Sequence, residues 1–406
     1  MKAISFLGTA PYQLTHYHYG DKECETEYFV ETLPVFFPDL EQVLVLLTPT
    51  VQRHENWAKV QARLGTLVKP VPIPEGHSET ELWEIFKALT DTVDDGETVV
   101  FDITNSFRSL PFLTFLAAAM LRTARQVNVQ RIVYGAYEAR DIATNRTPVF
   151  DLTPFVTLLD WLTATNQFIY TGNARYLAHL LEESQRPPLD HLAEQVDAIA
   201  MGLHLLRPLQ VSQSASQLPD ALTEAQEVLP LPFALLSKRL SQEYGQFGKG
   251  NLDDPWLLLY HQWQMINWYH RTDQIVHTLS MGREWLVSLL CVHFGVDTHN
   301  MYERGQLELL LSGGKNPQTG EESKYLARWD TVLCGKRLRK LWGAQPYNLA
   351  NVRNDVLHSG FRKNPKPAQE IVALTAEIVE ELNEIAKVWR ISERTPTSVE
   401  IPLCSS

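Results

Sequence analysis

Residues 98–112 read Thr-Val-Val-Phe-Asp-Ile-Thr-Asn-Ser-Phe-Arg-Ser-Leu-Pro-Phe, and this stretch decides the fold of the N-terminal part of the chain. Its apolar beginning predicts a buried strand over residues 98–103, and the polar Thr104-Asn105-Ser106 predicts a turn. The apolar residues that follow predict a helix over residues 107–126. A strand, a short turn and a helix in this order are typical of an α/β unit with parallel strands.

Further apolar runs repeat the strand pattern on both sides of this stretch. Residues 12–29 alternate around Gly20-Asp21, which predicts a β-hairpin, and a helix is expected over residues 80–93. We therefore expect residues 1–153 to form an α/β, Rossmann-like domain with a mostly parallel sheet. The other expected strands cover residues 3–7, 42–47, 68–73, 131–137 and 149–152.

The carboxyl ends of these strands are expected to hold a ligand, because ligands of open α/β sheets bind there. Backbone N–H groups and hydroxyls gathered at residues 104–106 suit a phosphate or the edge of a nucleobase. A helix start that binds no ligand explains the same residues. The Gly-Lys-Ser/Thr of a nucleotide P-loop is missing, and no Gly-x-Gly-x-x-Gly follows the first strand. The small or hydroxyl-bearing residues at the strand ends are Gly8, Thr9, Thr48, Thr50, Thr104, Asn105, Ser106 and Gly135.

From residue 154 onward the pattern is helical. The Ser, Gln and Pro residues of 208–232 predict a linker, and Gly282 is a candidate break in a long helical segment. We expect a helical connector at residues 154–245 and an all-α domain at residues 246–406. The expected helices cover residues 155–170, 173–184, 189–206, 255–294 and 370–389.

Charge is spread unevenly along the 406 residues. The net charge of −12 argues against generic, charge-driven binding of nucleic acid, yet residues 315–366 hold eleven Lys and Arg against four Asp and Glu. A solvated helix face explains this basic segment as well as a binding site does. The start of the chain lacks a signal-peptide pattern, and no apolar run approaches the ~18 residues of a membrane helix. With four scattered cysteines, Cys24, Cys291, Cys334 and Cys404, a cytoplasmic protein is expected.

The basic segment contains Asn351-Val-Arg-Asn-Asp-Val-Leu-His-Ser-Gly360, which predicts a short helix over residues 353–359 that Gly360 ends. Asn354 and His358 are four residues apart and share one face. A guanidinium, an amide and an imidazole are the groups that metal-free cleavage of a phosphodiester needs, so Arg353, Asn354 and His358 are candidate catalytic residues. A histidine favoured at a helix C-terminus by the macrodipole explains His358 without catalysis.

Similar spacings occur elsewhere in the chain. Arg186–His191 contains two prolines that break a helix, and Arg271–His277 lies in an expected core helix. Glu284 is a candidate to orient Arg353, and an ordinary surface glutamate is the alternative.

The stretch Asp102-Ile-Thr-Asn-Ser-Phe-Arg-Ser-Leu-Pro-Phe112 resembles the signature of the CRISPR-associated Rossmann-fold (CARF) domain. Phe6-Leu-Gly-Thr9, the hairpin and Ile132-Val-Tyr-Gly-Ala-Tyr137 are similar too, so the resemblance covers residues 1–150. It implies a dimer that binds a cyclic oligoadenylate messenger, with cyclic tetra-adenylate expected first and the ring size open. The ligand contacts it implies are Gly8, Thr9, Thr104, Asn105, Ser106 and Arg108.

CARF effectors often carry a C-terminal HEPN ribonuclease domain, whose Arg-x4-6-His motif resembles Arg353-Asn354-x3-His358. The combined resemblance implies an endoribonuclease for single-stranded RNA that is activated by the messenger and needs no metal or other cofactor. Because one chain supplies one His358, a homodimer or higher homo-oligomer is expected, with no membrane partner. Two alternatives stay open: a CARF pocket that degrades the messenger itself, and a non-enzymatic regulator that binds it.

Overall fold

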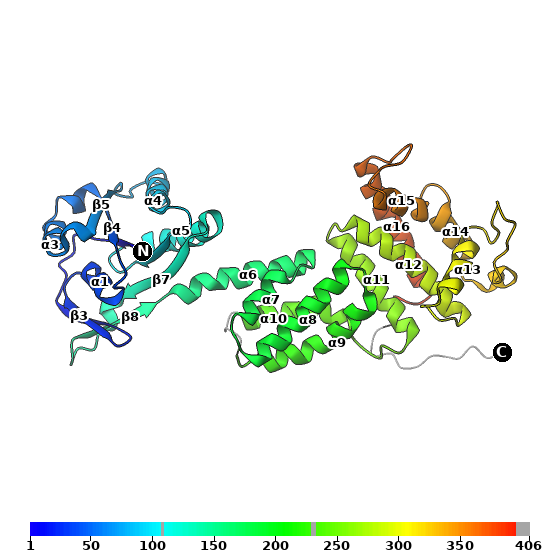
Figure 1. The fold of residues 1–406 in the computed structure, drawn as a ribbon, viewed down its shortest axis with the longest axis horizontal. Helices are drawn as coiled ribbons and strands as arrows, with labels where there is room; N and C mark the ends of the chain where they lie inside the picture. The colour runs from blue at the N-terminus through cyan, green and yellow to red at the C-terminus, as the bar shows by residue number, and fades with distance from the viewer. Residues whose placement is uncertain (107–108, 229–232, 395–406) are drawn as a thin grey trace. The chain divides into compact units, whose positions relative to one another are not determined.

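The computed structural model describes residues 1–106, 109–228 and 233–394. It divides the chain into two compact units, residues 1–160 and 161–406, which are coloured blue to cyan and cyan to red in Figure 1. Helix α6 (Thr153–Thr171) crosses the boundary between them. The division that we expect at residue 245, between connector and C-terminal domain, stays a prediction.

The first unit is built on an eight-stranded mixed sheet with the order β3-β2-β8-β7-β6-β1-β4-β5. The five neighbours from β7 to β5 are parallel, whereas β8 runs antiparallel to β7 and β3 antiparallel to β2. The expected α/β fold with a mostly parallel sheet is confirmed. The strands are β1 (Lys2–Phe6), β2 (Thr15–Tyr19), β3 (Lys22–Thr26), β4 (Gln42–Leu47), β5 (Val68–Pro72), β6 (Thr98–Asp102), β7 (Asn128–Gly135) and β8 (Arg146–Asp151).

Helices cover both faces of this sheet, and each face buries its own apolar cluster. On one face, Phe29 and Leu33 of the segment leading into α1 (Leu33–Phe36) pack with Trp57 of α3 (Glu55–Leu64). On the other face, Ile85 and Leu121 come from α4 (Glu79–Asp91) and α5 (Leu110–Arg125). Burial on both sides explains why the central strands are almost entirely apolar.

The second unit consists of helices joined by loops, with one isolated β-bridge between Lys315 and Glu322 among its described residues. Its core forms around α12 (Ile275–Phe294). By length and composition α12 could cross a membrane, but 67% of its apolar window is buried inside the unit, as in the core helix of a soluble protein. The other α-helices of the chain are α2 (Pro49–Gln52), α7 (Arg175–Glu182), α8 (Pro187–His204), α9 (Pro208–Ala225), α10 (Phe233–Tyr244), α11 (Pro255–Arg271), α13 (Met301–Leu311), α14 (Gly335–Gly343), α15 (Leu349–Leu357) and α16 (Ala368–Val388). The short 3-10 helices are η1 (Phe29–Thr32), η2 (Gly65–Leu67), η3 (Tyr137–Ala139), η4 (Gly245–Phe247) and η5 (Leu326–Thr331).

The expectation of a linker at residues 208–232 is wrong, because α9 occupies most of it. Val211, Ala215, Leu218 and Leu222 recur at helical spacing and are buried against neighbouring helices. Pro219 lies inside this helix. Burial of the apolar stripe therefore outweighs the low helix propensity of the Ser, Gln and Pro residues.

Gly282 does not interrupt the 255–294 segment, which breaks instead between α11 and α12, at residues 272–274. Gly282 lies inside α12, where a Cβ atom would come within 2.9 Å of Leu382 Cδ1. The glycine thus allows α16 to pack closely on α12, and close packing explains it better than a helix break does.

Candidate functional site

The carboxyl end of the sheet carries a cavity of about 250 Å³. Thr104, Asn105 and Gly135 line it, as expected, together with four tyrosines that the sequence did not single out. Its volume lies just below the ~300–1,000 Å³ that is usual for small-molecule sites, so one chain offers room for part of a larger ligand. The tyrosines are Tyr12, Tyr17, Tyr134 and Tyr137.

Asp102 organises the turn beneath this cavity. Its fully buried carboxylate accepts a hydrogen bond from Ser5 Oγ at 2.6 Å and another from the Thr104 backbone N–H at 2.8 Å. Burial raises the pKa of Asp102 to about 6, although the hydrogen bonds from Ser5 and Thr104 favour the charged form. Asp102 therefore links strands β1 and β6 and fixes where the Thr104–Ser106 turn begins.

The three residues of the turn have different roles in the structure. The Thr104 hydroxyl accepts a hydrogen bond from the Gly135 N–H at 2.9 Å, and Ser106 Oγ donates to the Ile103 carbonyl at 2.7 Å. The Asn105 side chain differs, because its Nδ2 is buried and has no hydrogen-bond partner within the described residues. A buried donor without a partner is costly, so Asn105 is the best placed of the three to bind a ligand acceptor.

The Gly8 loop lies beside the turn and is held by Tyr12. The Gly8 N–H donates to the Tyr12 hydroxyl at 2.9 Å, and the Gly8 carbonyl accepts from Asn56 Nδ2 at the same distance. Burial raises the pKa of Tyr12 to about 12, so this phenol stays neutral at physiological pH. Thr9 is exposed, and neither Gly8, Thr9 nor Ser106 lines the cavity. Arg108, the last expected ligand contact, lies outside the described residues.

Tyr17 is one of the cavity tyrosines that the sequence analysis did not single out, and its position in the alternating hairpin pattern is the signal that predicts it. Tyr17 alternates inward in the β2–β3 hairpin and is only 4% exposed, yet it lines the cavity. Its hydroxyl has no intramolecular partner in the part of the chain that the structure describes, and burial raises the pKa of this phenol. A buried tyrosine usually finds a partner for its hydroxyl, so Tyr17 offers a second polar group to a ligand.

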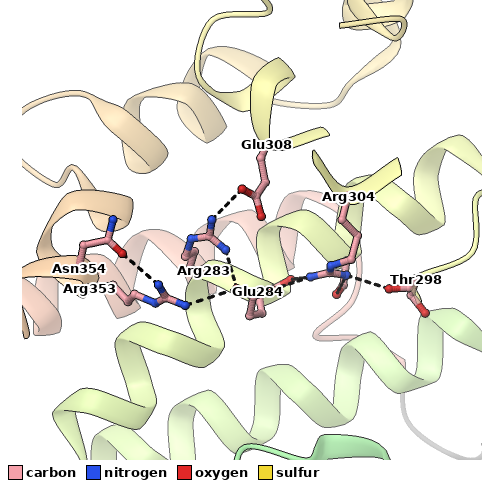
Figure 2. A network of polar contacts seen from close by, with 8 residues as sticks. Arg283, Glu284, Thr298, Arg304, Glu308, Arg353 and Asn354 are labelled. Carbon is pink, nitrogen blue, oxygen red and sulfur yellow. Dashed lines mark hydrogen bonds and ion pairs between the residues drawn. The ribbon is translucent and has the colours of Figure 1, made fainter. Parts of the chain in front are cut away.

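The helical unit contains a cluster of arginines around one carboxylate (Figure 2). Glu284 Oε1 accepts from Arg283 at 2.5 Å, and Glu284 Oε2 accepts from Arg304 at 2.7 Å. Arg353 Nη2 lies 3.9 Å from Glu284 Oε1. The ion pair of Arg283 with Glu308 at 2.8 Å extends the cluster. Burial opposes ionisation of Glu284, but Arg283 and Arg304 outweigh it, so the pKa of this carboxyl lies below its ordinary value.

Arg353 is held from two sides in this cluster. Its Nη1 donates to Asn354 Oδ1 at 3.0 Å, while Nη2 faces Glu284 (Figure 2). Its Nε is buried and has no partner within the described residues. Together with Glu284, Arg353 lines a cavity of about 470 Å³. The guanidinium is thus fixed in place and keeps hydrogen-bonding capacity that the protein does not use.

The helix that carries Arg353 differs in its bounds from our expectation of residues 353–359. It runs from Leu349 to Leu357, because Ser359 and Gly360 have positive φ values of 55° and 70° and end it. His358 is the C-cap residue and is exposed to solvent. Within the described residues its side chain makes no hydrogen bond or ion pair, so the structure brings Arg353 and Asn354 together but not His358.

The two competing Arg–His spacings are not arranged as sites. Arg186 is the N-cap of α8 and lies outside the helix, whereas His191 pairs with Glu224 at 3.0 Å. Arg271 forms an ion pair with Glu243, and His277 follows on a separate helix. Among the residues that the structure describes, no group of three or more His, Cys, Asp and Glu could hold a metal ion.

With these two sites described, comparison with known proteins adds three findings. A family model described as the second domain of CRISPR-associated protein MJ1674 matches residues 157–251. The CRISPR-associated protein MJ1674 of Methanocaldococcus jannaschii is 30% identical over 132 residues, which is 32% of this chain and about a fifth (20%) of that relative. The structure of Enterococcus italicus Csm6 bound to cyclic hexa-2'-fluoro-hexa-dAMP aligns with 97% of this chain and 98% of that chain, at a TM-score of 0.41 and 9% identity.

The family model and the curated relative both describe CRISPR-associated proteins. This chain is therefore similar to CRISPR-associated proteins over part of its length, and it spans about a fifth of the curated relative that it matches. The order of a mostly parallel α/β sheet followed by a helical unit agrees with the expected fold.

Proposed function

We propose that this chain is a messenger-activated, metal-independent endoribonuclease that cuts single-stranded RNA during CRISPR antiviral defence in the cytoplasm. The observation that carries the proposal is the environment of Arg353. Its guanidinium contacts Asn354 and Glu284, has a buried Nε with no partner in the described part of the chain, and lines a cavity. A preorganised cation of this kind stabilises negative charge that develops on a phosphate.

The reaction uses a nucleophile that RNA carries itself. The ribose 2′-OH attacks the adjacent phosphorus, the bond to the 5′-oxygen of the next nucleotide breaks, and a 2′,3′-cyclic phosphate forms. His358 accepts the proton of the 2′-OH or donates one to the leaving 5′-oxygen. Arg353 offsets the charge of the crowded phosphorus in the transition state.

A single exposed His358 cannot serve both proton transfers at once. Two chains that meet through their helical units would supply two Arg353–His358 pairs around one site, so the proposal includes a homodimer. The exposure of His358 supports this, because a second chain or the RNA can reach it.

The activator is proposed to be a cyclic oligoadenylate, with cyclic tetra-adenylate as the first to test, bound at the carboxyl end of the sheet. The Asn105 Nδ2 and the Tyr17 hydroxyl support a ligand there, because neither makes a hydrogen bond within the described residues. The cavity of about 250 Å³ is too small for a whole ring, which fits a messenger shared between two chains. The messenger stimulates cleavage only if it binds the active state more tightly than the inactive one.

The proposal is tested with fluorescent single-stranded RNA in EDTA, with and without cyclic tetra-adenylate. We expect stimulated cleavage by the wild-type chain and its loss in His358→Ala, while messenger binding by calorimetry is unchanged. Stimulated cleavage that persists in His358→Ala would show that the assignment is wrong. Degradation of the messenger by His358→Ala, detected by mass spectrometry, would indicate the alternative of a messenger-degrading pocket. Messenger binding by the wild-type chain without any RNA cleavage would indicate a regulator.

A further inference from the structure

Two adjoining cavities lie beside the arginine cluster, and together we call them the α9 groove. One, of about 440 Å³, extends along the start of α9, and the other, of about 470 Å³, reaches Arg353. Both volumes are within the ~300–1,000 Å³ that is usual for small-molecule sites. The residues common to both are Arg207, Pro208, Gln262, Ser288 and Arg304.

The groove presents hydrogen-bonding groups that the protein does not use. The side-chain amides of Gln210, Gln213 and Gln262 line it and make no hydrogen bond within the described residues. Arg207 is exposed and donates only to the Leu205 carbonyl, at 3.0 Å. Apolar side chains of Leu209 and Leu258 complete the walls. Amides suit the edge of an unpaired base, apolar side chains suit its face, and the guanidinium suits a phosphate.

Arg304 connects this groove to the proposed cleavage site. Its guanidinium donates to Ser288 Oγ and the Thr298 carbonyl, both at 3.2 Å, and to Glu284 at 2.7 Å (Figure 2). Glu284 in turn faces Arg353. Because its donors are taken up by the protein, Arg304 holds the wall in place and leaves Arg207 as the accessible cation.

Charge favours a polyanion as the occupant. The groove is lined by Arg207, Arg304 and Arg353 against the single carboxylate of Glu284, in a chain whose net charge is −12. Long-range attraction of RNA to such a chain is weak, so binding depends on local contacts of this kind.

We propose that the α9 groove binds the nucleotide of the single-stranded RNA substrate next to the phosphate that is cut, with Arg207 on a phosphate and Gln262 on the base edge. This inference rests on the proposed ribonuclease function. It gives the segment 205–213, which we expected to be connector and linker, a direct place in the substrate site. The loop between α8 and α9 and the start of α9 then form one wall of the site.

The test measures binding of fluorescent single-stranded RNA to the full chain by anisotropy, in a His358→Ala background so that nothing is cut. Arg207→Ala is expected to weaken binding by about 5-fold and to lower the slope of log Kd against log salt by about 0.7, because one phosphate contact is lost. Arg175→Ala is the matched control, because Arg175 is exposed, lines neither cavity and makes no side-chain hydrogen bond or ion pair within the described residues. The control is expected to bind like its parent.

Gln262→Leu tests the base contact in the cleavage-competent chain, with RNAs that differ only at the nucleotide beside the cut. A wild-type preference for one base that Gln262→Leu loses supports the groove. Equal RNA binding and an equal salt slope in Arg207→Ala and its parent would overturn the proposal that the α9 groove binds RNA. A change of oligomeric mass in Arg207→Ala would also overturn it, because the groove would then be a contact with a second copy of the chain. If the wild type never cuts RNA but Arg207→Ala still binds it more weakly, the groove stands and the ribonuclease proposal fails.

Discussion

Replacing Asp102 by Asn is expected to stabilise the sheet at neutral pH rather than weaken it. The carboxylate is fully buried and accepts from Ser5 Oγ and from the Thr104 N–H. An asparagine can keep both contacts, with Oδ1 accepting from Thr104 and Nδ2 donating to the Ser5 hydroxyl. The variant removes the cost of burying a charge without leaving a polar group unpaired.

The magnitude follows from the pKa of Asp102, which burial raises from 3.8 to about 6. A change of one in pKa corresponds to about 1.4 kcal/mol, so the charged form costs the fold about 3 kcal/mol. Since the folded pKa lies above the unfolded one, the contribution of Asp102 is most favourable below pH 3.8. It is lost as the pH rises through about 6. The advantage of Asp102→Asn over wild type should therefore grow from near zero at pH 3.8 to about 3 kcal/mol at pH 7.

Hydrogen exchange of peptides from β1 and β6, followed by mass spectrometry between pH 4 and pH 7.5, measures this free energy in the full chain. Asp102→Ala is the control: it also lacks the titrating carboxyl but leaves Ser5 and Thr104 without their acceptor, so it should be less stable than Asp102→Asn by about 1–3 kcal/mol across the range. An advantage of Asp102→Asn that is the same at pH 4 and pH 7 would refute the reasoning. It would show that burial does not shift the titration of this carboxyl.

Three further predictions test the messenger pocket, the arginine cluster and the packing of α9. Asn105→Ala should weaken messenger binding by about 10-fold, measured by calorimetry, and leave slow unstimulated cleavage intact, because its buried Nδ2 has no partner within the described residues. Unchanged messenger binding would contradict this. Glu284→Gln should lower the unfolding free energy in urea by about 1–2 kcal/mol, because the partly exposed carboxylate accepts from two arginines. Glu194→Gln is its control, because Glu194 is exposed and forms no ion pair within the described residues. Gly248→Ala should lower the free energy of unfolding by about 1–3 kcal/mol, because its Cβ would lie 2.1 Å from Ser216 N. Gly245→Ala is the control, because the nearest atom to its Cβ would be 3.6 Å away. Equal melting temperatures of the two alanine variants would argue against this packing.

Local patterns predicted the first unit well because its strands are short, apolar and buried on both faces. The expected strand over residues 42–47 is β4, and the hairpin around Gly20-Asp21 is β2 and β3. The turn at Thr104 and Asn105 was also found, because a polar tripeptide between an apolar strand and an apolar helix is typical of a turn. The sequence could not show that the Asn105 Nδ2 lacks a partner among the described residues while the Thr104 and Ser106 hydroxyls form hydrogen bonds with the backbone.

The second unit shows where local patterns are insufficient. Helix α9 was missed because Ser, Gln and Pro suggest a linker, and only the burial of its apolar stripe against other helices makes it stable. The Arg353–Asn354 pair was predicted from the Arg-x4-His pattern that ends at His358, and Glu284 was a candidate to orient Arg353. The convergence of Arg283 and Arg304 on that same carboxylate was not foreseen.

The sequence by itself therefore determined the order of the strands in the first unit and the positions of the Thr104 turn and the Arg353 helix, since these depend on residues close together in the chain. Only the tertiary structure decided which groups meet. Asp102 with Ser5 and Glu284 with Arg304 and Arg353 are contacts between distant segments, and so is the α9 groove beside the cluster. Such contacts form because burying the apolar faces of separate elements brings their polar residues together, and no local period in the sequence encodes that meeting.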